Sequence, residues 1–307
     1  MDTTTEYILV RSDGHSGALR GLQHPEQLIE LDGRLMPLNQ TSWQKTIWDD
    51  VYVDGLKYFA EIVGDAPLTV LDGGDLVQGN YHLDDVVSPI LKTQFEIGMK
   101  TFEPIYKTFP GAYQTVLLIG SRAHALDEEG TVETVMRDRL RAGGHYCEVY
   151  GHGALSIAGA IIDASHIGPN PGKGTNRGNA ILNYLKGAMW DELMLLGKIP
   201  PDLYLRFHYH DWTPAKTWSL QYQGETITSQ ALVCPPLSSM NGYGRGATKS
   251  VPYVHVGMML IRVRPDGLDV IPWVRVYDVR QYSEPGRGTV AFHYGGTPRP
   301  GRRVNKS

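Results

Sequence analysis

Leu68-Thr69-Val70-Leu71-Asp72-Gly73-Gly74-Asp75 is the stretch that decides the fold. Its apolar start predicts a short buried strand, and the two glycines break that strand so that Asp75 falls in a loop. The same pattern occurs where residues 7–10 stop at Ser12-Asp13-Gly14, and where residues 115–119 stop at Gly120-Ser121. Between the three runs lie segments whose apolar residues recur at helical spacing. This β-α-β rhythm predicts parallel strands joined by crossover helices.

Three helices are predicted in this first half of the chain. Apolar residues recur at helical spacing over residues 42–63, with Ser42 as the N-cap and Gly64 as the C-terminal stop. Further helices fit residues 86–109 and 131–142. Residues 19–42 are rich in Gly, Pro, Asn and Gln, and we expect them to be irregular.

The pattern changes after residue 144. Short strands with tight Gly turns, at residues 145–150, 154–157 and 160–164, are typical of an antiparallel meander. A helix over residues 179–196 leads to a strand at 203–207. β-hairpins are then expected at residues 217–222, 226–233, 254–263 and 268–277. The simplest assembly is two mixed sheets packed face to face with helices outside.

Composition limits the classes of protein that this chain can belong to. Its 307 residues suit one large domain, which we place at residues 1–285, followed by a loosely ordered basic tail at 286–307. A net charge of −4 gives no broad attraction to nucleic acid or membranes, although a local basic groove could still bind nucleic acid. Two cysteines cannot form a disulfide framework. No apolar run approaches the about 18 residues of a membrane span, and no signal peptide is apparent, so we expect a cytoplasmic protein.

Asp and His side chains follow two of the predicted strands in pairs. In an extended chain residues i and i+2 point to the same side, so Asp13 should converge with His15, and His208 with His210. A carboxylate and an imidazole at one strand end form half a site for Mn, Fe or Zn. Each pair also has an ordinary interpretation: Asp-Gly is common in turns, and eleven histidines readily produce one His-x-His by chance.

Asp75 and His166 extend this pattern to two more strand ends. Loops at the carboxyl ends of parallel strands are where α/β sheets bind ligands, and the glycines before Asp75 allow a close approach. The alternatives are an Asp that caps the next helix and a structural His. Four such motifs in one chain are hard to obtain by accident, which favours a metal site.

The order of these motifs resembles the calcineurin-like metallophosphoesterase superfamily. The family pattern is Asp-x-His, Gly-Asp, Gly-Asn-His, a single His, and His-x-His. The corresponding segments here are Asp13-Gly14-His15, Gly74-Asp75, Gly120-Ser121-Arg122-Ala123-His124, His166 and His208-Tyr209-His210. The third segment is similar to the Gly-Thr-Glu-Ala-His of phage and bacterial members. The resemblance covers about residues 7–211 and implies a four-layer α/β/β/α fold.

The resemblance also implies two divalent metal ions, with Mn favoured and Fe, Zn or Ni as alternatives. One ion would be held by Asp13, His15, Asp75 and His210. Asp75 would bridge to the second ion, which His166 and His208 would also hold. A water or hydroxide activated between two such ions attacks the phosphorus of a phosphate ester.

The third segment departs from the family. Ser121 stands where the family has an Asn ligand, and Arg122 stands where it has a His. A Ser is a poor ligand for a divalent ion, although the hydroxyl of Ser121 or a water could complete the set of ligands. His124 could replace the missing ligand or protonate the leaving oxygen, and Arg122 could pair with a phosphate oxygen, although a solvated Arg is an equal alternative. Asn80 and His82 could line the same pocket, or could be ordinary loop residues.

By this resemblance, the expected activity is metal-dependent hydrolysis of a phosphodiester, with a nucleic acid or a nucleotide as substrate. A phosphomonoesterase or nucleotide pyrophosphatase on the same site is the first alternative. The altered third segment favours a second alternative, a catalytically impaired metal-binding scaffold protein. We expect no membrane partner, and the location would be the host cytoplasm if the chain is phage-encoded. The sequence does not indicate the oligomeric state.

Overall fold

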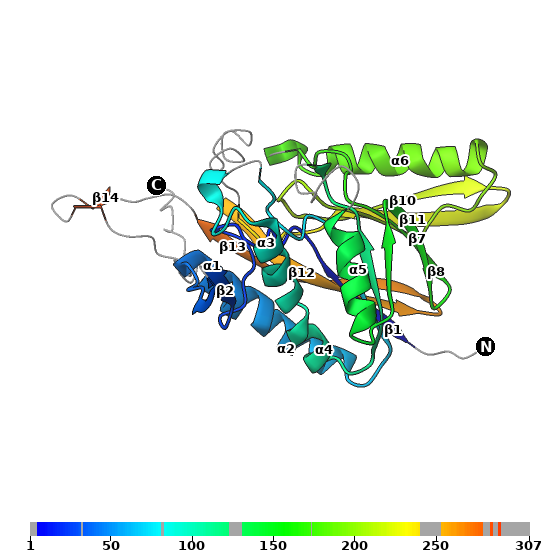
Figure 1. Ribbon diagram of the computed structural model, residues 1–307. Coiled ribbons are helices and arrows are strands. Elements are labelled where there is room, and N and C mark those ends of the chain that lie inside the picture. The colour runs from blue at the N-terminus through cyan, green and yellow to red at the C-terminus, as the bar shows by residue number, and fades with distance from the viewer. Residues whose placement is uncertain are drawn as a thin grey trace.

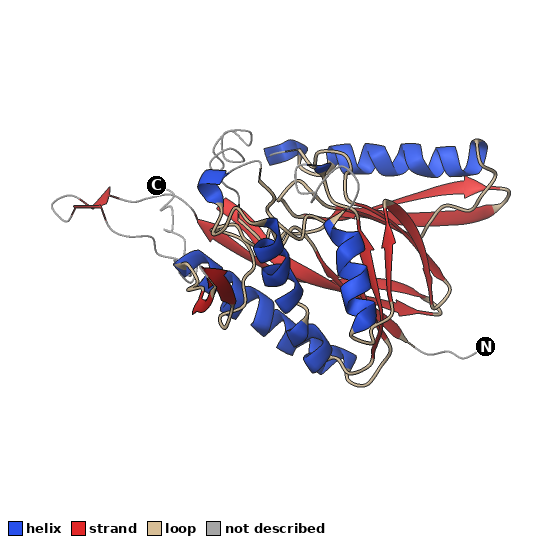
Figure 2. Ribbon diagram, viewed as in Figure 1, coloured by secondary structure: helices blue, strands red, loops and turns tan. Residues whose placement is uncertain are grey.

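The computed structural model describes residues 5–31, 33–80, 83–122, 131–172, 174–239 and 253–278, together with two short strands, β14 (Ser283–Glu284) and β15 (Gly288–Thr289). Two large mixed sheets face each other, and helices cover their outer faces (Figure 1). Figure 2 shows these layers by type of secondary structure.

The first sheet has six strands in the order β13-β12-β1-β4-β5-β6. Its parallel part is formed by β1 (Glu6–Arg11), β4 (Leu68–Asp72), β5 (Ala112–Leu118) and β6 (Cys147–Tyr150). The antiparallel hairpin of β12 (Tyr253–Arg264) and β13 (Gly267–Asp278) is added beside β1.

The second sheet has five strands in the order β10-β11-β9-β8-β7. At its centre β9 (Leu203–Arg206) lies parallel to both β8 (Ala160–Ser165) and β11 (Glu225–Val233). Hairpins complete the edges with β7 (His152–Ile157) and β10 (Thr213–Tyr222). The carboxyl ends of β8 and β9 therefore point the same way.

The helices divide between the two outer faces. The first sheet is covered by α1 (Ser42–Thr46), a π-helix at Ile47–Val53, α2 (Asp54–Val63), α3 (Leu91–Lys100), α4 (Glu103–Thr108) and α5 (Val132–Ala142). The second sheet is covered by α6 (Asn179–Met194). Short 3-10 turns occur at Leu83–Asp85 and Gly174–Asn176.

Three apolar clusters fill the spaces between these layers. One packs the first group of helices on the first sheet and includes Phe59 and Val70. A second lies between the sheets and includes Val10 and Leu205. The third packs Leu185 and other residues of α6 on the second sheet. Because burying each apolar face drives the packing of the layers, the result is the expected α/β/β/α order.

Two predicted helices differ in detail from the structure. The first has its N-cap one residue earlier than expected, because Thr41 and not Ser42 is the N-cap and forms a capping box with Gln44. The helix predicted over 86–109 is instead two helices, broken at Thr101 and Phe102. The backbone carbonyl of Thr101 accepts hydrogen bonds from the side chains of Arg11 and Tyr52, which compete with continuation of the helix.

Two other local predictions were wrong. Residues 19–42 contain a hairpin of β2 (Leu28–Leu31) and β3 (Arg34–Pro37). Residues 145–150 do not begin an antiparallel meander: β6 pairs parallel to β5, because α5 returns the chain to the same end of the first sheet. Only β7 and β8 form the expected antiparallel pair. The predicted tail at 286–307 lies outside the described residues except for Gly288–Thr289.

Among the helices in the described part of the chain, none is long and apolar enough to cross a membrane.

Candidate metal centre

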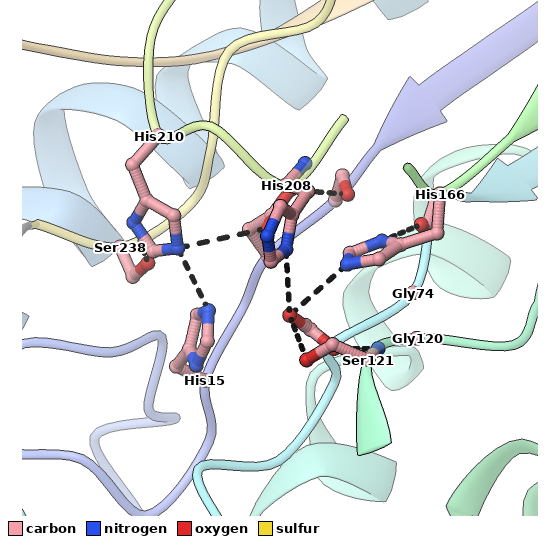
Figure 3. A network of polar contacts seen from close by, with 12 residues as sticks. His15, Gly74, Gly120, Ser121, His166, His208, His210 and Ser238 are labelled. Atoms are coloured by element: carbon pink, nitrogen blue, oxygen red, sulfur yellow. Dashed lines mark hydrogen bonds and ion pairs between the residues drawn. The ribbon is translucent and has the colours of Figure 1, made fainter. Parts of the chain in front are cut away.

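Loops from both sheets meet at one edge and bring six predicted ligands together. Their side chains form two groups, and within each group one ligand atom per residue lies within 4.8 Å of the others. The two groups consist of Asp13, His15 and His210, and of Asp75, His166 and His208. Figure 3 shows the four histidines facing a common space. The two groups fit a site for two divalent ions.

The first group joins the end of β1 to the loop after β9. Nε2 of His15 lies 2.9 Å from Nε2 of His210, and Oδ1 of Asp13 lies 3.7 Å from the same nitrogen of His210. The other carboxylate oxygen of Asp13 accepts a 2.5 Å hydrogen bond from the hydroxyl of Ser12. Ser12 therefore fixes the carboxylate with Oδ1 toward the imidazoles.

The second group is centred on Asp75 after β4. Oδ2 of Asp75 lies 3.1 Å from Nε2 of His166 and 3.8 Å from Nδ1 of His208. Nδ1 of His166 lies 2.6 Å from the carbonyl of Gly73, and because a carbonyl only accepts, this nitrogen carries a proton. The lone pair of the neutral ring is then on Nε2, toward Asp75, which is the orientation that a metal-binding imidazole requires.

Most of these candidate ligands have a left-handed backbone conformation. Among the described residues, seven non-glycine residues have a positive φ, and five of them are candidate ligands: Asp13, His15, Asp75, His208 and His210, with φ between 41° and 73°. The Asp-x-His and His-x-His pairs are therefore not extended, contrary to expectation. Sharp turns bring Asp13 and His15 into one group and divide His208 and His210 between the two groups. Strained backbone of this kind clusters at functional sites.

The donor set fits a divalent metal ion. Oδ1 of Asp13 and Nδ1 of His208 are buried and have no hydrogen-bond partner among the described residues. Such atoms are costly to bury unless something satisfies them. Imidazole and carboxylate together suit Mn, Fe, Zn or Ni better than Ca or Mg, which prefer oxygen alone.

The electrostatics of the centre favour positive charge. Burial lowers the pKa of His166, but the contact with the carboxylate of Asp75 and the negative charges of Asp13 and Asp75 outweigh it and raise that pKa to about 9. The two buried carboxylates therefore stabilise a cation between them, whether that cation is a proton or a metal ion.

Ser121 of the divergent third segment lies at the second group. Its backbone N–H donates to Oδ1 of Asp75 at 2.6 Å, and its hydroxyl lies 3.1 and 3.2 Å from the two carboxylate oxygens. Arg122 and Asn80 are exposed. His82 and His124 lie outside the described residues.

Several residues that support the ligands were missed in the sequence. Asp211, next to His210, accepts from Nδ1 of His255 at 2.7 Å and pairs with Arg177 at 3.1 Å. Asp72 pairs with Arg11 behind the centre. These contacts join positions far apart in the chain. The only signals in the sequence were that Asp211 directly follows the His-x-His motif and that Arg11 lies two residues before Asp13.

Comparison with known proteins gives a likeness of fold alone. No protein-family model and no curated protein sequence matches the chain. Among solved structures, it is similar to an archaeal phosphodiesterase (11% identity, 87% of this chain and 99% of the other, TM-score 0.37). It is also similar to the NAD nucleotidase NadN of Haemophilus influenzae (11% identity, 94% and 54% covered, TM-score 0.35). The third is the calcineurin-like phosphoesterase YfkN of Bacillus subtilis (11% identity, 90% and 91% covered, TM-score 0.31). At this level of overlap, the chemistry has to be argued from the chain's own residues.

Proposed function

We propose that this chain is a metal-dependent phosphoesterase of the calcineurin-like type, which hydrolyses a phosphodiester with water at a site for two divalent ions. The observation that carries the proposal is the convergence of six Asp and His side chains from loops of both sheets into two adjacent groups. Two divalent ions held there would supply an activated water and neutralise charge on the phosphoryl oxygens.

The chain's own residues have distinct roles in this proposal. Asp13, His15 and His210 would hold one ion, and Asp75, His166 and His208 the other, with Asp75 the candidate bridge. The hydrogen bond from His166 to Gly73 keeps the ring turned toward Asp75, and Ser12 keeps the carboxylate of Asp13 turned toward His210. Preorganised ligands of this kind lower the cost of binding the metal.

Ser121 is proposed to take the place of the Asn ligand of the family. Its hydroxyl is within 3.2 Å of both carboxylate oxygens of Asp75, so a small ion or an ordered water beside Asp75 would be in reach of it. Arg122 follows directly and is exposed, so it is available to bind a phosphate oxygen. For His124 the proposal keeps the role expected from the sequence, an acid for the leaving oxygen.

A diester is proposed over a monoester because the third segment is similar to that of phage and bacterial members of the family, for which nuclease chemistry is plausible. Two divalent ions and Arg122 can balance the charge of either ester, so the comparison of substrates below decides between them. A nucleotide or nucleic acid is the proposed substrate, Mn the proposed metal, and the cytoplasm the proposed location.

The proposal is tested by removing metal from the protein, adding Mn²⁺, and comparing hydrolysis of bis(p-nitrophenyl) phosphate with that of p-nitrophenyl phosphate. We expect at least tenfold faster turnover of the diester, and two ions bound per chain by elemental analysis. Faster turnover of the monoester would favour the nucleotidase-like alternative. Bound metal without p-nitrophenol release from either compound would identify a scaffold protein.

Two ligand variants and one matched control complete this test. Asp75→Asn and His166→Gln should each lower turnover by at least a thousandfold, because each loses a ligand that few other groups can replace. His145→Gln is the control, since this His precedes β6 and therefore lies at the opposite edge of the sheet. Its turnover should equal that of the wild type.

A further inference from the structure

A buried ion pair lies behind the candidate metal centre. Arg11 is the last residue of β1 and Asp72 the last of β4, and the two residues are paired in the register of the sheet. Nε of Arg11 donates to Oδ2 of Asp72 at 2.8 Å, and the residues are only 2% and 3% exposed. Because a buried pair seldom repays the cost of removing two charges from water, its presence here suggests a role other than stability.

The guanidinium of Arg11 is fixed from several sides. One of its terminal nitrogens, Nη1, donates to the hydroxyl of Thr101 at 3.1 Å and to the hydroxyl of Tyr52 at 3.3 Å. The ring of Phe102 lies against it, with 3.8 Å between Cζ and the ring centroid. A side chain with this many contacts has essentially one conformation, so it gives Asp72 a rigid anchor.

Asp72 connects this fixed guanidinium to the loops that contain the candidate ligands Asp13 and Asp75. Its second oxygen, Oδ1, accepts a 3.0 Å hydrogen bond from the backbone N–H of Gly74. The carbonyl of Gly74 in turn accepts from the N–H of Asp13, and that of Asp75 accepts from the N–H of His15, each at 3.0 Å. One carboxylate therefore anchors the turn from which both loops are hydrogen-bonded.

We propose that Arg11 and Asp72 are positioning residues for the metal centre, which act through the turn at Gly74 and not by contact with metal or substrate. The pair holds Asp75 in its left-handed conformation and sets the distance between the loops after β1 and β4. This inference rests on the proposed function, because the ligands are positioned for ions that the proposal assigns.

The test replaces the pair by apolar side chains of similar size, as Arg11→Met/Asp72→Leu. Such a replacement keeps the core filled, so the melting temperature of the metal-free protein should stay close to that of the wild type. Two quantities should nevertheless change. Amide hydrogen exchange of residues 72–76 in the metal-free protein should accelerate at least tenfold, and the Kd for Mn²⁺ measured by calorimetry should rise at least tenfold.

Val63→Ala is the matched control for lost stability. Val63 is buried in the cluster on the helix side of the first sheet and is the last residue of α2. This variant should melt at a lower temperature than the wild type but keep its Kd for Mn²⁺ and its exchange at residues 72–76. If the double variant does not fold, Arg11→Lys replaces it, since the lysine keeps the charge and loses the branched contacts; its Kd should rise at least threefold.

Unchanged exchange at residues 72–76 together with an unchanged Kd would overturn the inference and leave the pair with a purely structural role. A wild type that binds no Mn²⁺ would overturn the proposed function. In that case the exchange measurement still decides whether the pair holds the turn, so the two failures are distinguishable.

Discussion

Nε2 of His15 lies 2.9 Å from Nε2 of His210, although 195 residues separate them in the chain. Two neutral imidazoles that face each other in this way can share a proton or turn both lone pairs to a cation. Oδ1 of Asp13 lies 3.7 Å from Nε2 of the same His210. A cation bound between these three atoms would satisfy all of them.

Metal binding should therefore stabilise the fold. At a hundredfold excess over its Kd, one bound ion adds about 3 kcal/mol to the free energy of unfolding, which raises the melting temperature by roughly 4–5 °C in a chain of 307 residues. Differential scanning calorimetry of the metal-free protein with and without Mn²⁺ measures this shift. Asp75→Asn should reduce it, and equal shifts in both proteins would contradict the assignment of Asp75.

Gly74→Ala should disrupt the centre without removing a candidate ligand. Gly74 has a φ of +98°, and a Cβ there would lie 2.9 Å from Cα of Gly120 and 2.9 Å from Nδ1 of His166. We expect a loss of about 1–3 kcal/mol in stability and at least tenfold weaker Mn²⁺ binding. The control is Gly33→Ala, which has a φ of +72° but open space around the new Cβ. It should cost about 1 kcal/mol and leave the Kd unchanged.

Glu133 should make the stability of the metal-free protein depend on pH. Burial, chiefly, and the nearby charges of Asp72 and Asp75 raise the pKa of this carboxyl from 4.5 to about 7. A carboxyl with a raised pKa favours the folded state fully below pH 4.5, and this contribution is lost as the pH rises through about 7.

Glu133→Gln should consequently stabilise the protein at pH 8 by up to about 3 kcal/mol and have little effect at pH 4.5. Urea unfolding at the two pH values measures the difference. The amide oxygen of Gln can still accept from the N–H of Gly120, which Glu133 accepts at 3.4 Å. The exposed Glu61→Gln is the control and should show no such pH dependence. An equal effect of Glu133→Gln at both pH values would argue against a raised pKa.

The start of the first helix offers a test of the observed cap against the one expected from the sequence. The side chain of Thr41 accepts from the N–H of Gln44, and that of Gln44 accepts from the N–H of Thr41. Thr41→Ala should lower the free energy of unfolding by about 1 kcal/mol. Ser42→Ala should lower the free energy of unfolding far less. A larger loss in Ser42→Ala than in Thr41→Ala would identify Ser42 as the N-cap.

The fold could be predicted largely because its signals are local. Short apolar runs ended by glycines identified β1, β4 and β5, and alternation identified the hairpins of the second half. The errors have long-range causes. The strand after α5 was assigned to the wrong sheet because its partner, β5, lies far away in the sequence. The helix predicted at 86–109 is interrupted where the carbonyl of Thr101 accepts hydrogen bonds from Arg11 and Tyr52.

The candidate site divides in the same way. The types and order of the six candidate ligands are readable in the sequence, because each follows a strand that its own neighbours specify. Which of them share a group, and the contact of Ser121 with Asp75, depend on how strands from two sheets are ordered. The ligand roles themselves, and that of His124, remain predictions.

The sequence by itself determined the layers and the chemistry available at the strand ends, because periodicity and turn residues act over a few positions. Only the tertiary structure decided the left-handed turns that aim the ligands and the Arg11–Asp72 pair behind them. Those features arise from hydrogen bonds between residues many positions apart, which form only once the strands have paired and burial has removed the competing water.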